Sequence, residues 1–227
     1  MPERRHESPN QLAMIHTVAG LIPDLETLTR RHLPEWQVFN MLDESLLRLT
    51  IRDGAVSAMT ARRLTGIIWS AVDAGADAVL VTCSSLGNAV EMIAPLCPVP
   101  LLRIDAGMAQ AAVANGGRIG VLATLQTTLT PTADLIAAVA RETGASCTVT
   151  SQLVEGAFET LQSGDREKHD AQVAEGIARL ARESDVVVLA QASMARALDR
   201  LEPRPNGPPV LTSPALGIAH IAKILPR

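Results

Sequence analysis

Cys83 is the residue of this sequence best suited to chemistry. It lies two positions after the apolar segment Ala78–Val81, which is typical of a buried strand, and directly before two serines that are typical of a helix start. A thiol at such a junction can act as a nucleophile, an acid or a base, and the helix N-terminus lowers its pKa. The alternative is a small core residue, because a lone cysteine after a buried strand commonly only packs. We favour the chemical role for Cys83 and interpret Cys97 and Cys147 as structural.

The second half of the sequence is similar to the first half. The segment Asp77–Pro95 aligns with Asp185–Pro203 without a gap, and Cys83 then aligns with Gln191. An amide can donate and accept hydrogen bonds, but it cannot exchange a proton at neutral pH. Because duplicated α/β units normally place their copies face to face around a shared cleft, we expect a two-sided site. Its walls would carry the thiol of Cys83 and the amide of Gln191.

Short apolar runs rich in Val, Ile and Leu alternate with longer helical patterns along the chain. This alternation is typical of βα units whose parallel strands are buried on both faces. The predicted strands are Leu12–Ile15, Trp36–Asn40, Ala78–Val81, Leu101–Ile104, Arg118–Leu122, Ser146–Thr150, Val186–Leu189 and Val210–Thr212. The predicted helices are Leu25–His32, Ser45–Leu49, Ala55–Ala74, Asn88–Ala94, Ala106–Asn115, Pro131–Glu142, Ala157–Gly164, Arg166–Glu183 and Ala215–Leu225.

This order of elements predicts an α/β protein with two pseudo-symmetric, Rossmann-like lobes. Each lobe would contain about four parallel strands flanked by helices. We expect an N-terminal lobe over residues 1–105, completed by residues 214–227, and a C-terminal lobe over residues 106–213. The active site is expected between the two lobes.

The carboxyl ends of the strands are the expected place for a ligand, as in other open parallel sheets. Four predicted turns at such ends carry small hydroxyl residues just before a helix: His16–Val18, Cys83–Ser85, Ala123–Thr128 and Gln191–Ser193. Exposed N–H groups and the helix dipole suit such a turn to a carboxylate. Each hydroxyl alone could be an ordinary N-cap. Two related pairs of turns that face one cleft nevertheless favour anion binding.

His16 is the histidine that lies at a predicted strand end, and it is a candidate ligand contact together with Thr17. The other histidines are predicted at the terminus or on helix surfaces: His6, His32, His169 and His220. Asp43 follows the second predicted strand and could either line the cleft or cap the next helix. We favour the cap.

Composition and charge argue against several classes of function. Of the 227 residues, 47% are hydrophobic and only 2% are aromatic, and the net charge of −4 leaves no basic surface for nucleic acid. No apolar run approaches the length of a membrane span, and the polar N-terminus does not read as a signal peptide, so we expect a cytoplasmic protein. Three cysteines without a CxxC pair argue against a disulfide framework and a zinc site. The scarcity of aromatic residues favours an aliphatic acid as ligand.

The chain resembles the aspartate/glutamate racemase superfamily over nearly its whole length. This superfamily includes hydantoin racemases, maleate isomerases and arylmalonate decarboxylases. Val81–Ser85 is similar to the first catalytic-cysteine turn, and Gly120–Thr127 is similar to the Gly-Val-x-x-Thr-x-x-Thr loop. Val188–Met194 lies where the family has Leu-Gly-Cys-Ala/Thr. The order and spacing of the three segments together are fairly specific.

The resemblance implies cofactor-independent chemistry at the carbon next to a carboxylate, with Cys83 as base, acid or nucleophile. Main-chain N–H groups and hydroxyls would hold the carboxylate and stabilise the enediolate-like charge of the reaction. The residues that the resemblance assigns to this role are Ser84, Ser85, Thr124, Thr127 and Ser193. Ala192 and Thr17, in the same turns, are further expected contacts.

The sequence departs from the family pattern at Gln191, because family racemases use two cysteines on opposite faces. We expect a racemase-like isomerase of a small acid or amino-acid derivative, with Cys83 as the reactive group and Gln191 orienting the ligand. One-sided proton transfer, with His16 or water as the second group, and nucleophilic addition by Cys83 both remain open. The alternatives are a lyase or decarboxylase with a single cysteine and a non-catalytic protein that binds a small carboxylate. Association with further copies of the same chain is expected.

Overall fold

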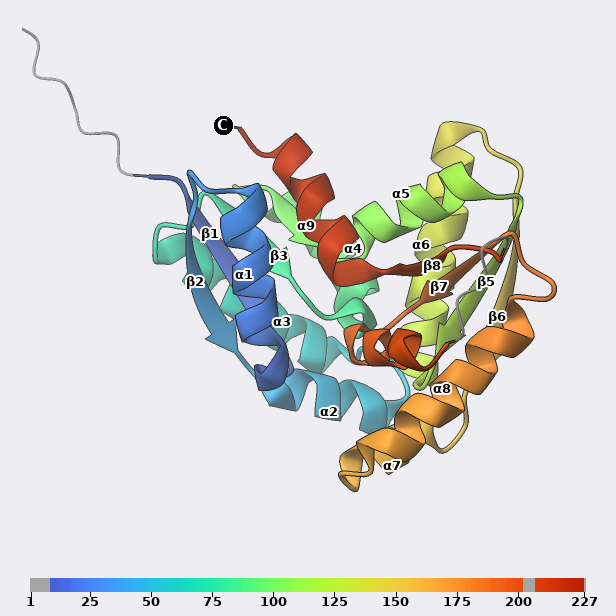
Figure 1. The fold of residues 1–227 in the computed structure, drawn as a ribbon. Coiled ribbons are helices and arrows are strands. Elements are labelled where there is room, and N and C mark those ends of the chain that lie inside the picture. The colour runs from blue at the N-terminus through green and yellow to red at the C-terminus, as the bar shows by residue number, and fades with distance from the viewer. Residues whose placement is uncertain (1–8, 202–206, 227) are drawn as a thin grey trace, which may run out of the picture.

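Two lobes lie side by side in the computed structural model, which describes residues 9–201 and 207–226 (Figure 1). Each lobe contains one sheet of four strands, and all neighbouring strands are parallel. The first sheet has the order β2-β1-β3-β4 and the second has the order β6-β5-β7-β8, so the strands of the two halves are arranged alike. This confirms the predicted α/β fold with two parallel sheets. His6 and Pro203 lie outside the described residues.

The central strands of both sheets are buried almost throughout, which explains their nearly continuous apolar sequences. The edge strands β2 and β6 are half-exposed and contain polar residues, so their sequences mark their ends poorly. Both lie slightly later in the chain than predicted, and Cys147 precedes β6. The strands are β1 (Gln11–His16), β2 (Gln37–Leu42), β3 (Ala78–Val81), β4 (Leu101–Arg103), β5 (Arg118–Ala123), β6 (Thr148–Leu153), β7 (Val186–Leu189) and β8 (Val210–Thr212).

Helices connect the strands in every described crossover. The α-helices are α1 (Ile22–His32), α2 (Glu44–Asp53), α3 (Ala58–Asp73), α4 (Gly87–Ile93), α5 (Ala106–Asn115), α6 (Gln126–Thr143), α7 (Ala157–Gln162), α8 (Arg166–Leu180) and α9 (Ser213–Ile224). Short 3-10 helices are η1 (Ala19–Leu21), η2 (Ser84–Leu86), η3 (Ala94–Leu96) and η4 (Ala192–Arg200). In the described residues, no helix combines the length and the apolar character that crossing a membrane requires.

Asp43 caps α2, as the sequence analysis favours. Its carboxylate accepts hydrogen bonds from the backbone N–H of Ser45 at 2.9 Å and from the guanidinium of Arg63 at 2.7 Å. The helix ends at Gly54, which has a positive φ of 69°. The caps at Asp43 and Gly54 thus mark the beginning and the end of α2, which directly follows β2.

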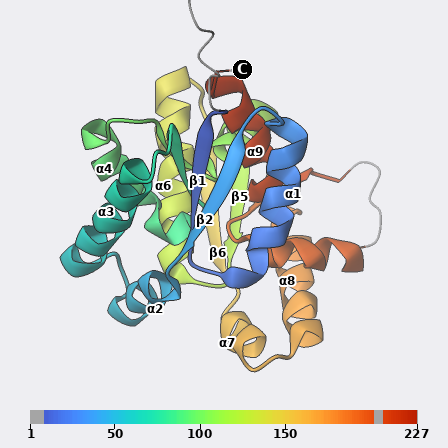
Figure 2. The same cartoon turned by 90° about the vertical axis from the view of Figure 1, so that its left-hand side faces the viewer.

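The two lobes exchange their last helices. Helix α5 follows the first sheet in the chain, but Met108 and Ala112 on this helix pack with strands β5 and β7 of the second sheet. Helix α9 follows the second sheet, and its residues Ile218 and Ile221 pack with β1, β3 and α1 of the first sheet. Figure 2 shows α9 beside α1 on one face of the first sheet, with α3 and α4 toward the other face.

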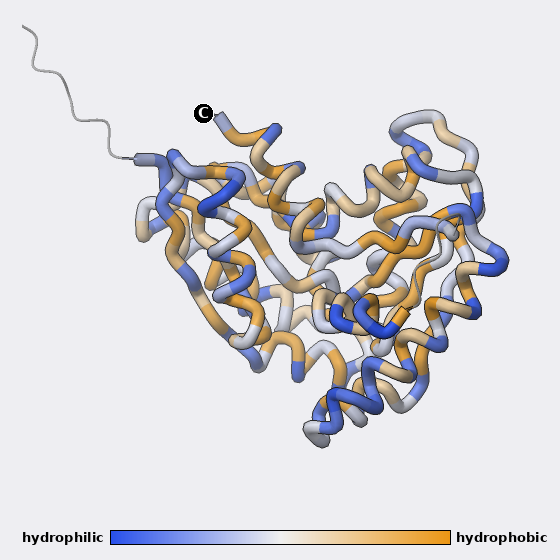
Figure 3. Tube along the Cα trace, in the orientation of Figure 1, coloured by the Kyte–Doolittle hydropathy of each residue, from blue (hydrophilic) through white to orange (hydrophobic). Residues whose placement is uncertain are grey.

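Two glycines allow close approaches between α9 and the segment that runs from the end of β4 into α5. A side chain at Gly107 would overlap the backbone of Leu216, and one at Gly217 would overlap the backbone oxygen of Ile104. Hydrophobic residues run through the strands, whereas hydrophilic residues gather on the outer helices (Figure 3). The close contact of α5 with α9 is one of the contacts that hold the two lobes together.

Candidate functional site

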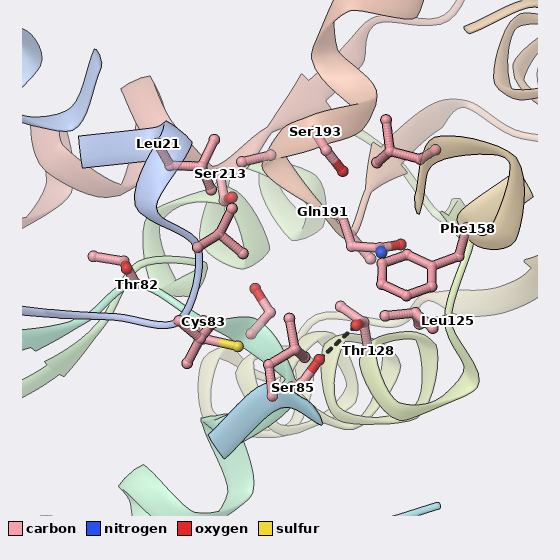
Figure 4. A pocket seen from close by; sticks show the side chains of 17 residues that line it. Leu21, Thr82, Cys83, Ser85, Leu125, Thr128, Phe158, Gln191, Ser193 and Ser213 are labelled. Atoms are coloured by element: carbon pink, nitrogen blue, oxygen red, sulfur yellow. Dashed lines mark hydrogen bonds between the residues drawn. The ribbon is translucent and has the colours of Figure 1, made fainter. Parts of the chain in front are cut away.

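A cavity of about 240 Å³ lies between the two lobes at the carboxyl ends of the strands (Figure 4). Residues that directly follow β1, β3, β7 and β8 contribute to its lining, as do Leu125 and Thr128 from the segment after β5. This is where open parallel sheets place their ligands, because the turns there expose N–H groups at helix starts. Both halves of the chain therefore build one cavity.

Cys83 belongs to the wall that the first lobe contributes. It ends the extended segment after β3, and its sulfur points into the cavity (Figure 4). Burial raises the pKa of the Cys83 thiol, although hydrogen bonds from the Thr17 side chain and from the backbone N–H groups of Ser85 and Leu86 act in the opposite direction. The expected lowering of this pKa is therefore wrong, because desolvation outweighs the N–H groups of the short helix η2.

Gln191 belongs to the opposite wall, after β7, and lies across the cavity from Cys83 (Figure 4). The amide oxygen of Gln191 accepts hydrogen bonds from the backbone N–H of Thr124 at 2.7 Å and from its hydroxyl at 3.1 Å. The amide nitrogen lies 2.9 Å from the same hydroxyl. Thr124 thus holds Gln191 in one orientation.

A threonine forms a hydrogen bond with Cys83 on one side of the cavity, and another threonine does so with Gln191 on the other side. Thr17 follows β1 and interacts with Cys83, whereas Thr124 follows β5 and interacts with Gln191. Strands β1 and β5 occupy the same position in their sheets. On each side, a threonine that follows one central strand therefore pairs with a lining side chain that follows the neighbouring central strand.

Serine residues supply the polar part of the lining. Ser84 and Ser85 stand at the start of η2, and Ser193 stands at the start of η4 beside Ala192. The hydroxyl of Ser85 lies 2.6 Å from the hydroxyl of Thr128 on α6, which is a hydrogen bond between the two lobes. The first N–H groups of a helix have no partner within it, so these starts can receive an anion.

Three predicted contacts do not line the cavity: His16, Thr124 and Thr127. His16 is fully buried between Asn40, at 2.9 Å from its Nε2, and Thr82, at 3.0 Å from its Nδ1. Burial lowers the pKa of His16, which keeps the ring neutral near pH 7. Thr124 is engaged by Gln191, and the hydroxyl of Thr127 is buried without a hydrogen-bond partner among the described residues.

His169 is buried rather than exposed on a helix surface, contrary to the prediction. Its Nδ1 lies 2.8 Å from a carboxylate oxygen of Asp170, and Asp170 accepts hydrogen bonds from Arg196 on η4 at 3.1 and 3.3 Å. This cluster joins α8 to η4, the element that carries Ala192 and Ser193. These hydrogen bonds tie the second wall to α8.

Several lining residues have no signal in the sequence. They are apolar or hydroxyl residues of helices and turns that only the tertiary arrangement brings to the cavity: Leu21, Leu47, Thr128, Phe158, Leu161 and Ser213. Over residues 9–201 and 207–226, no group of three His, Cys, Asp or Glu side chains is placed to hold a metal ion. The arrangement instead offers a thiol, hydroxyls and helix N-termini around a small space.

Comparison with known proteins gives a family and several structural neighbours. A family model described as Asp/Glu/Hydantoin racemase matches residues 15–221. No curated protein matches the sequence. Glutamate racemase RacE1 from Bacillus anthracis is similar in structure, with a TM-score of 0.69 and 15% identity, over 97% of this chain and 82% of that one.

Two further solved structures show the same likeness. Glutamate racemase from Francisella tularensis, in complex with D-glutamate, has a TM-score of 0.71 and 12% identity, over 96% of this chain and 81% of that one. Allantoin racemase from Klebsiella pneumoniae has a TM-score of 0.62 and 16% identity, over 95% and 87%. At such identities the likeness shows a shared fold.

Proposed function

Because this chain belongs to the Asp/Glu/hydantoin racemase family, we propose that it is a cofactor-independent isomerase that acts on the carbon next to a carboxylate. Cys83 is the reactive group in this proposal. The observation that carries it is the position of the sulfur, which points into a cavity shared by the two lobes and faces Gln191 across it. Among the described residues of the lining, Cys83 is also the only one whose side chain can ionise.

The carboxylate of the substrate binds at the helix starts beside Cys83. The hydroxyls of Ser84 and Ser193 and the N–H groups at the beginning of η4 are donors there. The hydroxyl of Ser85 is shared with Thr128, and the N–H groups of Ser85 and Leu86 also face the Cys83 thiol. These donors stabilise the negative charge more strongly when the adjacent carbon loses a proton, because the charge then spreads onto the carboxylate oxygens. The helix starts therefore bind the substrate and stabilise the reactive intermediate together.

Cys83 transfers a proton on one face of this carbon. Its thiolate removes the α-proton, the electron pair of the C–H bond moves into the carboxylate, and the resulting thiol can return a proton to the carbon. On the opposite face, Gln191 cannot exchange a proton. Because His16 does not line the cavity, a water molecule is the proton donor that inversion requires on that side.

A lyase is the second candidate, and the pairing of Cys83 with Gln191 favours it. If the substrate carries two carboxylates on the α-carbon and the bond to one of them breaks, CO2 leaves with its oxygen atoms and the electron pair spreads onto the remaining carboxylate as an enediolate. The Cys83 thiol then donates one proton, and no second acid is needed. The raised pKa of Cys83 favours the protonated form that this step uses.

The test uses single enantiomers of small carboxylic acids and amino-acid derivatives in deuterated water. Deuterium at the α-carbon with loss of optical purity supports the isomerase, whereas release of CO2 with deuterium on one face supports the lyase. Replacing Cys83 by alanine should reduce turnover by about 10²- to 10⁴-fold, the usual contribution of a positioned acid or base. Cys97→Ala, a thiol outside the cavity lining, is the matched control.

Full turnover by Cys83→Ala would contradict both catalytic proposals. Wild-type protein that binds carboxylates, as seen in a thermal shift, but turns none of them over would instead indicate a binding protein.

A further inference from the structure

The lining of the cavity has a polar part and an apolar part, and they come from different elements. The polar part consists mainly of residues at the strand ends, such as Cys83, Ser85, Gln191 and Ser193. The apolar part comes mainly from helices and the residues just before them. Val18 and Leu21 lie at η1, Leu47 lies on α2, Leu125 precedes α6, and Phe158 and Leu161 lie on α7. A ligand held at the strand ends therefore directs its remaining atoms toward aliphatic and aromatic side chains.

Charge is missing from the lining. Within the described ranges 9–201 and 207–226, no Asp, Glu, Lys, Arg or His side chain lines the cavity. A second carboxylate on the substrate would have no cation beside it, and an α-ammonium group would have no carboxylate. Charges taken out of water without a partner carry a large free-energy cost.

Two nearby groups that could have supplied a partner are already engaged. The amide oxygen of Gln191, which could accept from an ammonium group, accepts two hydrogen bonds from Thr124. The buried guanidinium of Arg103 binds both oxygens of Asp105 at 2.7 and 2.9 Å, contacts Glu91, and lies outside the lining. Neither is free to compensate a second charge on a ligand.

The phenyl ring of Phe158 shows where the apolar part of the ligand would lie. Figure 4 places Phe158 and Leu125 beside Gln191, across the cavity from Cys83. The volume of about 240 Å³ is below the roughly 300–1,000 Å³ of pockets for drug-sized ligands. The site thus fits a small molecule with one apolar substituent.

We infer that the substrate is a small monocarboxylate with an uncharged α-substituent and an apolar side chain, such as an N-acylated aliphatic amino acid. Free amino acids and dicarboxylic acids are poor ligands in this inference. It rests on the proposed isomerase for the position of the carboxylate at the helix starts, and it adds the chemical class of the rest of the molecule. The lyase would instead need a second carboxylate on the α-carbon, which this inference disfavours.

The first test is binding, measured by calorimetry with the Cys83→Ala variant so that no turnover interferes. Four ligands separate the two charges: N-acetyl-L-leucine, N-acetyl-L-aspartate, L-leucine and L-aspartate. Leucine and aspartate have side chains of nearly the same shape, so N-acetyl-L-aspartate tests the side-chain charge. L-leucine tests the α-ammonium group together with loss of the acetyl group, and L-aspartate combines both changes. N-acetyl-L-leucine should bind at least about tenfold more tightly than each of the other three, the lower end of what one mismatched group costs in a pocket.

The second test introduces a charge into the apolar part. Leu161→Lys places an ammonium group there, and it should weaken binding of N-acetyl-L-leucine and strengthen binding of N-acetyl-L-aspartate, so that the preference falls by about tenfold or more. Leu96→Lys makes the same change at a side chain that is 74% exposed and outside the lining, and it should leave the preference unchanged. Circular dichroism checks that both variants fold.

Equal or tighter binding of N-acetyl-L-aspartate or L-leucine to the Cys83→Ala protein would overturn the inference, and so would binding of none of the four. These outcomes do not depend on whether Leu161→Lys folds. They also stay separate from the proposed function. If N-acetyl-L-leucine binds selectively but the wild type does not exchange its α-proton, the ligand class holds and the proposed isomerase fails.

Discussion

At the scale of single residues, the state of the Cys83 thiol is set by two opposing effects. Burial favours the neutral thiol, whereas the Thr17 side chain and two backbone N–H groups favour the thiolate. Burial dominates, so the pKa is raised and little thiolate exists near pH 7. A substrate carboxylate at the same helix starts would add a negative charge nearby and favour the thiol further.

Alkylation measures this balance directly. Because the thiolate is the reactive form, the rate at which iodoacetamide modifies Cys83 should keep rising with pH beyond the range in which an ordinary cysteine levels off. Thr17→Val removes a hydrogen bond that lowers the pKa of Cys83, so alkylation at pH 8 should slow, by about tenfold for each unit of added pKa. Site-resolved mass spectrometry follows the reaction.

Thr124→Val is the control for that experiment, because Thr124 interacts with Gln191 on the other wall. It should leave alkylation of Cys83 unchanged. Faster alkylation of Cys83 in Thr17→Val would contradict the assigned role of Thr17.

At the scale of elements, a buried ion pair anchors the end of β4. Arg103 is 7% exposed and Asp105 is fully buried, and their side chains form two parallel hydrogen bonds. The guanidinium lies against Gly87 at the start of α4, where any side chain would overlap it. It also reaches the carbonyl of Pro131 on α6 at 3.5 Å, so this pair connects elements of both halves.

Removing one partner of this pair should be costly. Asp105→Ala leaves the Arg103 guanidinium short of its main partner in a buried place, and we expect a loss of about 3–5 kcal/mol in the free energy of unfolding. Glu175→Ala breaks an exposed pair with Arg179 on α8 and should cost no more than about 0.5 kcal/mol. Urea denaturation of both variants makes the comparison, and similar losses would contradict the structural role of Arg103.

Prediction from the sequence succeeded where burial leaves a clear pattern. The bounds of β3, β7 and β8 agree with those predicted, and α5 covers the predicted residues Ala106–Asn115. Helix α6 begins at Gln126, five residues before Pro131, because this proline is accommodated inside the helix rather than at its start. A proline can mark either position, and the sequence does not distinguish them.

The candidate site was predictable only in part. Turns such as Cys83–Ser85 follow buried strands, and the general position of sites in parallel sheets places them at the cavity. Phe158 and Leu47 lie on helices that follow edge strands, and nothing in their local sequence distinguishes a lining position from ordinary packing. The burial of His16 likewise depends on Asn40 and Thr82, which are distant in the chain.

At the scale of the whole molecule, the packing of α9 against Ile104 and α5 joins the two lobes. Gly217→Ala would push α9 against the backbone of Ile104, and we expect a loss of about 1–3 kcal/mol in the free energy of unfolding from overpacking. Gly66→Ala, on α3 with open space around it, should instead stabilise the protein by about 0.5–1 kcal/mol. Urea denaturation measures both changes. An equally harmless Gly217→Ala would show that α9 can move away from Ile104 freely.

The exchange of α5 and α9 also bears on how the polypeptide is made. During synthesis the first four strands leave the ribosome long before Ile218 and Ile221, which cover part of their sheet. A nascent chain generally folds in the order in which it emerges. Here the part of the amino-terminal sheet that α9 covers stays open until translation has passed β8, so the two halves complete their folding nearly together.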